Sequence, residues 1–163
     1  MALSKLGSAG GVPTTEKTGD IPLRNWYEGA WPEGASKISG QVIHETIWLK
    51  HTFCFACPIG CGKEVEIKEG PYKMHGHGPE YETLAGFGGN LKNDNLDSIA
   101  RLNDLCNRYG MDTISTSATL AFACEAFEKG YITREDTGGS ELVFGNADGI
   151  IDAVHKIAHR EGI

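Results

Sequence analysis

Three closely spaced cysteines constrain this chain more than any other feature. Cys54, Cys57 and Cys61 form a Cys-x2-Cys-x3-Cys pattern in a run of small and apolar residues that includes Gly60 and Gly62. This spacing lets one loop direct three thiolates at a single point, and glycine permits the backbone angles that a loop wrapped around a metal centre requires. The pattern therefore predicts a metal-binding loop.

The spacing alone leaves three interpretations of this loop open. An iron–sulfur cluster takes four ligands, mostly thiolates, and accepts three of them from one loop. A structural zinc ion more often uses two Cys-x2-Cys pairs, although His75 or His77 could complete a Cys3His set. The third interpretation is that the cysteines are buried or joined in a disulfide. The spacing favours the iron–sulfur cluster.

The composition narrows the class of protein. A chain of 163 residues can form one main folding unit with a core of its own. No apolar run approaches the roughly 20 residues that a membrane helix needs, so we expect no membrane span. The net charge of −7, without a basic cluster, argues against a nucleic-acid partner and favours a small molecule or a protein.

The cysteine usage also indicates a compartment. The count of five cysteines is odd, three of them lie within eight residues, and the N-terminus lacks the charged-then-apolar profile of a signal peptide. These features fit a reducing environment, and we expect a cytoplasmic protein.

The chain divides into an N-terminal segment, residues 1–35, and a folding unit, residues 36–163. Repeated glycine and proline in residues 1–35 predict an irregular segment packed on the rest of the molecule. Trp26, Tyr27 and Trp31 lie in this segment, and we expect the three aromatic side chains to pin it onto a core, either in this chain or in a neighbouring domain.

Apolar periodicity predicts a mostly α fold with at most one short β-ribbon. Ser39 is positioned to cap a helix, and residues 63–68 alternate polar and apolar as in a strand. Further helices are expected over about 80–87 with a break at Gly88 and Gly89, from near Asp94 to Gly110, from 112 or 113 to 129, and from about 147 to Gly162.

Three ordered motifs carry a resemblance to a known family. They are residues 54–62, which carry the three cysteines and end at Gly62, residues 78–83 (Gly-Pro-Glu-Tyr-Glu-Thr) and residues 105–115 (Leu-Cys-Asn-Arg-Tyr-Gly-Met-Asp-Thr-Ile-Ser). Together they resemble the tungsten-containing aldehyde ferredoxin oxidoreductases, and weaker similarity at residues 23–26 and 144–146 extends the resemblance over nearly the whole chain. The resemblance implies the middle, helical domain of that family. The β-rich domain that holds much of the pterin and the domain with the fourth cluster cysteine would lie in other chains or domains.

The resemblance implies roles for specific residues. Cys54, Cys57 and Cys61 would bind a four-iron four-sulfur cluster close to a tungsten (or molybdenum) bis-pterin centre. Glu82, with Tyr81 beside it, would be the carboxylate that moves protons as the aldehyde becomes an acid, a task suited to a buried carboxylate with a raised pKa. Read from the residues alone, Glu82 is more simply an acidic residue in the first turn of a helix.

The third motif resembles the pterin-binding pattern Asp-x-x-Gly-Leu-Asp, with Asn107, Gly110 and Asp112 at its key positions. Asn107 departs from the pattern, because an amide oxygen accepts a hydrogen bond without the ionic reinforcement of a carboxylate. Asp112 keeps the charge of the pattern and could also cap the helix that is expected to start at 112 or 113. Arg101 stands where some family members bind an intersubunit metal through a glutamate, and an arginine cannot be a ligand.

Four other residues are given simpler interpretations. His75 and His77 are expected in a surface turn, and Cys106 and Cys124 are expected to pack in the core from helix faces.

The resemblance implies one part of a tungsten–pterin oxidoreductase that oxidises aldehydes to carboxylic acids and passes electrons through a 4Fe–4S cluster to ferredoxin or another electron-transfer protein. The chain would be inactive without the parts of the enzyme outside it. Two alternatives stay open. One is the tungsten subunit of a benzoyl-CoA reductase-like enzyme, and the other is a non-catalytic module that binds an iron–sulfur cluster or zinc.

Overall fold

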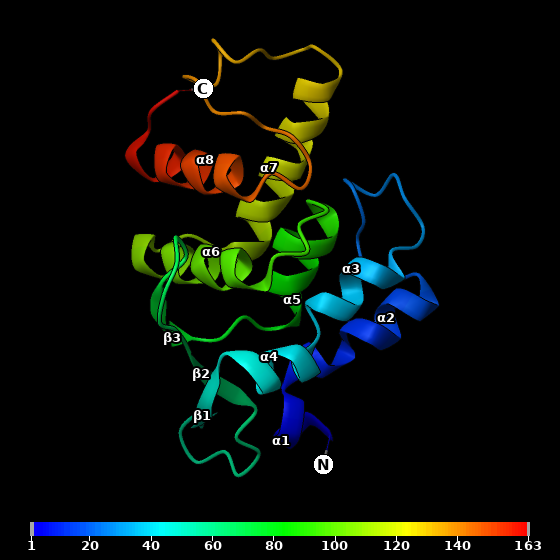
Figure 1. The fold of residues 1–163 in the computed structure, drawn as a ribbon, viewed down its shortest axis with the longest axis vertical. Helices are drawn as coiled ribbons and strands as arrows, with labels where there is room; N and C mark the ends of the chain where they lie inside the picture. The colour runs from blue at the N-terminus through cyan, green and yellow to red at the C-terminus, as the bar shows by residue number, and fades with distance from the viewer. Residues whose placement is uncertain (1, 163) are drawn as a thin grey trace.

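Helices dominate the computed structural model, which describes residues 2–162 (Figure 1). The N-terminus and the cysteine loop lie at one end of the long axis and the C-terminus lies at the other (Figure 1). The helical elements are α1 (Ala2–Leu6), the 3-10 helix η1 (Ser8–Gly11), α2 (Val12–Thr18), α3 (Pro32–Lys37), α4 (Gly40–Thr46), α5 (Tyr81–Thr83), the π-helix η2 (Leu84–Asn90), α6 (Leu96–Tyr109), α7 (Thr113–Glu128) and α8 (Ala147–His159).

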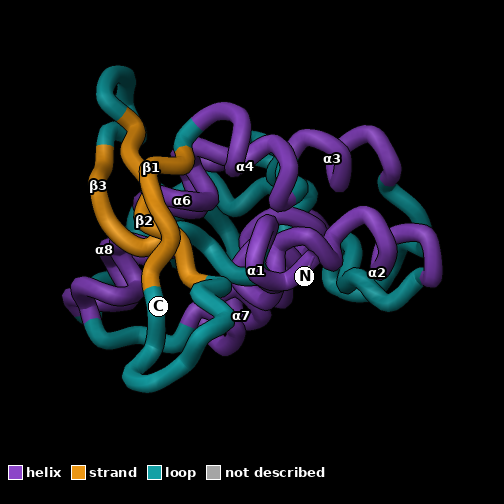
Figure 2. Tube along the Cα trace, turned by 90° about the horizontal axis from the view of Figure 1, so that it is seen from below, coloured by secondary structure: helices purple, strands orange, loops and turns teal. Residues whose placement is uncertain are grey.

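The predicted ribbon is one antiparallel sheet with three strands, in the order β1 (Trp48–Thr52), β2 (Gly62–Ile67) and β3 (Met74–His77). Figure 2 shows these strands together at one side of the helices. Strand β2 alternates as the sequence predicts, with Lys63, Val65 and Ile67 buried. Helix α6 packs against β3, so the sheet is anchored to the helical core through its third strand.

The main helices begin and end close to the predicted residues, because their capping residues are explicit in the sequence. Ser39 caps α4 and Asn95 caps α6, and in each case the side-chain oxygen accepts a backbone N–H three residues on. Gly110 ends α6 in the left-handed conformation. Helix α8 ends at His159, earlier than predicted, and its C-cap Arg160 adopts a left-handed φ of 57°.

Residues 2–35 contain regular helices, in contrast to the irregular segment predicted for residues 1–35, and they pack on the rest of the chain. They contain α1, η1, α2 and part of α3, and Val12 and Leu23 are fully buried in the common core. Two of the prolines that predict an irregular segment do not interrupt a helix. Pro13 and Pro32 occupy the first turns of α2 and α3, where a fixed φ favours the helix and the missing N–H has no intrahelical acceptor.

Only one of the three N-terminal aromatic side chains pins the segment onto the core. Trp31 is half-buried against the core, whereas Trp26 and Tyr27 are 72% and 82% exposed. Arg24, Asn25 and Trp26 all adopt left-handed backbone angles, with φ of 46°, 50° and 66°. Trp26 and Tyr27 therefore do not pin the segment onto the core of this chain, and their contact with a neighbouring domain stays a prediction.

Gly88 and Gly89 do not break the helix that begins at α5. They belong to η2, a π-helical stretch in which every residue is buried. A Cβ atom on Gly88 would lie 2.4 Å from Ile38 Cδ1, and one on Gly89 would lie 2.5 Å from the carbonyl oxygen of Pro22. Glycine at these two positions therefore lets neighbouring segments pack closely against η2. Helix propensity depends on the local sequence and does not predict this packing.

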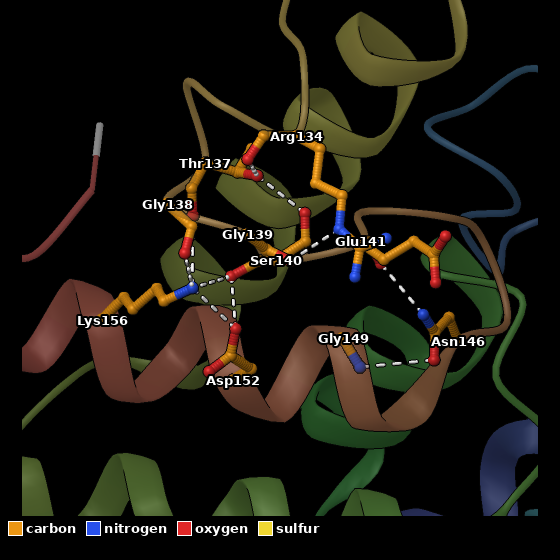
Figure 3. Close-up of polar contacts among 10 residues, drawn as sticks. All are labelled: Arg134, Thr137, Gly138, Gly139, Ser140, Glu141, Asn146, Gly149, Asp152 and Lys156. Carbon is orange, nitrogen blue, oxygen red and sulfur yellow. Dashed lines mark hydrogen bonds and ion pairs between the residues drawn. The ribbon is translucent and has the colours of Figure 1, made fainter.

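Polar contacts join residues 133–146 to helix α8, and most of them are made by the ammonium group of Lys156 (Figure 3). Lys156 donates to the carbonyl oxygens of Thr137 and Gly138 at 3.3 and 2.9 Å, and to Ser140 Oγ at 2.7 Å. Its Nζ atom also lies 2.8 Å from Asp152 on the same helix. This network fixes the connection between α7 and α8.

None of the helices between residues 2 and 162 has the length and apolar character that crossing a bilayer requires.

We predict that Gly89→Ala destabilises the fold by about 1–3 kcal/mol, the usual cost of overpacking, because the obstructing atom is a backbone carbonyl that cannot rotate away. Urea unfolding followed by circular dichroism measures this. Gly29→Ala is the control, since no atom lies within 4 Å of a Cβ at that position. Equal stability of the two variants would refute the packing role of Gly89.

Candidate metal and cofactor site

The three predicted cysteine ligands lie on one loop, residues 53–61, which joins β1 to β2. The Cys57 N–H donates to the Cys54 carbonyl oxygen at 3.0 Å, which forms a turn inside the loop. Gly60 has a left-handed φ of 61°, and a Cβ there would lie 2.3 Å from the Phe53 ring. The loop conformation therefore depends on glycine at this position.

All three thiols are free, Cys54 being exposed and Cys57 and Cys61 partly buried, so they are neither paired nor packed in the core. Within residues 2–162, no group of three or more His, Cys, Asp and Glu side chains is arranged to hold a single metal ion. The sequence predicts His75 and His77 in a surface turn, but both lie on β3. There, His75 Nε2 lies 2.7 Å from Glu64 Oε1. Three free thiols on one loop match the donor set of an iron–sulfur cluster.

Cys106 and Cys124 behave as predicted, since both are fully buried. Burial raises the pKa of the Cys106 thiol to about 11 and that of the Cys124 thiol to about 12. Neutral, buried thiols of this kind are packing groups rather than ligands.

The side chain of Lys63 lies next to the end of the cysteine loop. Its side chain is 3% exposed, and Nζ is buried without a hydrogen-bond partner in the described part of the chain. A Cβ on Gly7 would lie 2.2 Å from Lys63 Nζ and 2.6 Å from the carbonyl oxygen of Cys61, so both atoms crowd the same glycine. Burial lowers the pKa of the Lys63 ammonium, while the negative charges of Glu80 and Cys61 act in the opposite direction.

The second motif is joined to this region through backbone and side-chain contacts. The Gly78 N–H donates to the Lys63 carbonyl oxygen at 2.8 Å, and Glu80 Oε1 lies 3.9 Å from Lys63 Nζ. Ser8 donates its hydroxyl to the Glu80 carboxylate and accepts the Tyr81 N–H at 2.9 Å. The N-terminal segment therefore helps to position the start of α5.

The buried Thr83 hydroxyl connects the second motif to the third. It lies 3.3 Å from Asn103 Oδ1 on α6 and 3.1 Å from Thr113 Oγ1 at the start of α7. One hydroxyl can donate to the amide oxygen and accept from the second hydroxyl, so both contacts can be satisfied together. The Asn103 amide in turn donates to the His77 carbonyl oxygen at 3.0 Å.

A cavity of about 310 Å³ lies where the three motifs meet. It is lined by Gly62, Lys63, His77, Gly78, Glu80, Asn103 and Asn107. Of the residues predicted from the family resemblance, only Asn107 lines this cavity. Lys63 and Asn103 were not singled out from the sequence, since an isolated lysine in a strand and an asparagine in a helix carry no local signal.

The other predicted site residues are placed as follows. Glu82 is exposed in the first turn of α5, and Tyr81 is half-buried beside it. Gly110 and Asp112 lie in the exposed connection between α6 and α7. Asp112 caps α7, and hydrogen bonds from Ser115 lower the pKa of its carboxyl group. No described residue encloses Glu82, so the burial that its predicted role calls for would have to come from outside this chain.

Arg101 binds a carboxylate rather than a metal. Its guanidinium lies 2.9 Å from Asp104, a buried side chain that also pairs with Arg108 at 2.8 Å. The two arginines compensate the buried charge of Asp104.

A family model described as "Aldehyde ferredoxin oxidoreductase, domains 2 & 3" matches residues 1–163. The chain belongs to this family. The tungsten-containing aldehyde ferredoxin oxidoreductase of Pyrococcus abyssi is 40% identical over 163 residues, covering 98% of this chain and 26% of the relative. The "Aliphatic sulfonate oxidoreductase, WOR-like subunit" of Pyrococcus furiosus is 32% identical over 157 residues, covering 95% of this chain and 25% of the relative.

Among solved structures, the active-site complex BamBC of benzoyl coenzyme A reductase with 1,5-dienoyl-CoA matches with a TM-score of 0.72. The identity is 20%, and the match covers 93% of this chain and 22% of the other. This likeness shows a shared fold. The chain thus spans about a quarter of the length of the aldehyde ferredoxin oxidoreductases that it matches.

We expect Thr83→Val to destabilise the chain by about 1–3 kcal/mol, because it leaves the buried Asn103 amide oxygen without its hydroxyl donor. Chemical denaturation measures the loss, and hydrogen exchange should show reduced protection at the start of α7. Thr83→Ser is the control, since it keeps the hydroxyl and loses one methyl group. If the valine variant is as stable as the serine variant, Thr83 does not join the two motifs energetically.

Proposed function

We propose that this chain is the cluster-binding and pterin-contacting part of a tungsten oxidoreductase that oxidises aldehydes to carboxylic acids and delivers the electrons to ferredoxin. The observation that carries the proposal is the meeting of three separate motifs around one cavity, beside a loop with three free thiols. The family membership of the chain and the names of its tungsten-containing relatives support it.

The thiols and the pterin-motif residues fit the group that the family implies. Cys54, Cys57 and Cys61 would hold the 4Fe–4S cluster, with a fourth ligand from outside the described residues. Asn107 lines the cavity and Asp112 is exposed nearby in sequence, so both can meet a pterin from the protein surface. The bound tungsten and cluster would supply the two-electron oxidation and the onward electron transfer.

The role of Glu82 follows from the proton balance. An aldehyde and one water give a carboxylic acid, two protons and two electrons. The carboxylate of Glu82 would accept one of these protons from the attacking water or its product, and Tyr81 would orient the groups around it. The exposed position of Glu82 in this chain leaves its carboxylate free to face another domain.

A second candidate is the tungsten subunit of a benzoyl-CoA reductase-like enzyme, favoured by the shared fold with the BamBC complex. The same motifs would then serve reduction of an aromatic ring. Assays of the assembled enzyme with an aldehyde and with benzoyl-CoA distinguish the two, because each substrate class would be turned over by only one of them.

The cluster assignment is tested by metal analysis of the enzyme that contains this chain. We expect iron and acid-labile sulfide in the unmodified protein and a loss of both in a Cys54→Ser, Cys57→Ser double variant. Cys106→Ala is the control and should keep its iron, because Cys106 is buried in the helical core. Zinc in place of iron, or full iron in the double variant, would exclude the assignment.

The assignment of Glu82 is tested by Glu82→Gln, which should lower aldehyde turnover by about 10²–10⁴-fold while iron and tungsten contents stay unchanged. Glu33→Gln is a matched control, since Glu33 is an exposed acidic residue in the first turn of α3. Unaltered turnover in the Glu82 variant would remove this carboxylate from the mechanism.

A further inference from the structure

The buried ammonium of Lys63 is not explained by the fold. Its side chain is 3% exposed, and Nζ has no hydrogen-bond partner among residues 2–162. Leaving a charged group buried and unpaired is costly, and an apolar side chain of similar length would fill the same space without that cost. A structural role alone therefore does not account for a lysine here.

The nearest carboxylate compensates Lys63 only in part. Glu80 Oε1 lies 3.9 Å from Nζ, which is too long for a hydrogen bond. The other oxygen of Glu80 accepts the hydroxyl of Ser8, and the Glu80 side chain is 46% exposed. Solvent therefore screens the charge of Glu80 more effectively than the charge of Lys63.

Lys63 lies close to the end of the cysteine loop both in the sequence and in space. Lys63 follows Cys61 by two residues on β2, and its Nζ atom and the Cys61 carbonyl oxygen both crowd Gly7. Lys63 also lines the cavity at which the three motifs meet. A buried positive charge is thus fixed between the cysteine loop and the cavity.

We propose that Lys63 raises the reduction potential of the iron–sulfur cluster held by Cys54, Cys57 and Cys61. This inference rests on the proposed function, because it requires the cluster. Reduction adds one electron to a cluster whose thiolate ligands already make it negative, and net charge is one of the properties that set its potential. A nearby buried cation favours the more negative, reduced form, and low local polarity strengthens the effect.

Glu80 provides a test of opposite sign. Its carboxylate lies close to the same amine and opposes the effect of Lys63. Lys63→Met should therefore lower the cluster potential, Glu80→Gln should raise it, and Lys63→Arg should leave it near the original value because the positive charge is kept. A purely structural role of Lys63 predicts no such ordering.

The experiment is a redox titration of the assembled enzyme, followed by the electron paramagnetic resonance signal of the reduced cluster. Lys68→Met is the matched control, since it removes the same charge from a side chain that is 77% exposed. We expect a downward shift for Lys63→Met that exceeds any shift for Lys68→Met. Equal potentials for Lys63→Met and the unmodified enzyme would overturn the inference.

Two further outcomes are distinguishable. If the unmodified enzyme contains no cluster, the proposed function fails, and the role of Lys63 fails with it. If Lys63→Met loses its iron while the other variants keep theirs, this variant has no cluster to titrate. The titrations of Glu80→Gln and Lys63→Arg then test the proposal. An upward shift in Glu80→Gln with an unchanged potential in Lys63→Arg supports the proposal, and the absence of that shift refutes it.

Discussion

The structure depends on the burial of η2. Every residue of this π-helix is inaccessible, and it packs against α3, α6 and α7. The N-terminal segment attaches to it through backbone hydrogen bonds from Arg24 to Gly89 and from Asn25 to Asn90. Because η2 continues directly from α5, the same burial fixes the residues that end the second motif. Irregular helical geometry of this kind is frequent at functional sites.

The candidate site is assembled by polar links between elements that are distant in sequence. Ser8 positions Glu80, the Lys63 backbone holds Gly78, and Thr83 joins α5 to α6 and α7. Each link satisfies a buried or half-buried polar group, which makes the arrangement specific as well as stable. The cysteine loop, by contrast, carries Phe53 and Phe55 at its surface, 64% and 102% exposed, so the described residues leave most of these two rings uncovered.

Local signals explain which parts of this structure were predictable. Capping residues such as Ser39, Asn95 and Gly110 define helix ends within a few positions, and the cysteine spacing identifies the loop. Pro13 and Pro32 lie in the first turns of helices, a local preference that the reading of proline as a breaker overlooks. The other missed features depend on tertiary contacts, because Gly89 accommodates a carbonyl group from Pro22 and Lys63 gains its importance from burial. A single sequence shows the residue types at these positions but not their neighbours.

The anchoring of Thr83 limits how the adjacent Glu82 can move. The Thr83 side chain is 4% exposed and hydrogen-bonded to two other helices, so the backbone at the start of α5 cannot shift without disturbing the core. The Glu82 carboxylate can travel only as far as rotation about its own side-chain bonds allows. In the function proposed above, gating of proton transfer at Glu82 would therefore come from movement of the part of the enzyme that faces it, because the helix that carries Glu82 is held in place.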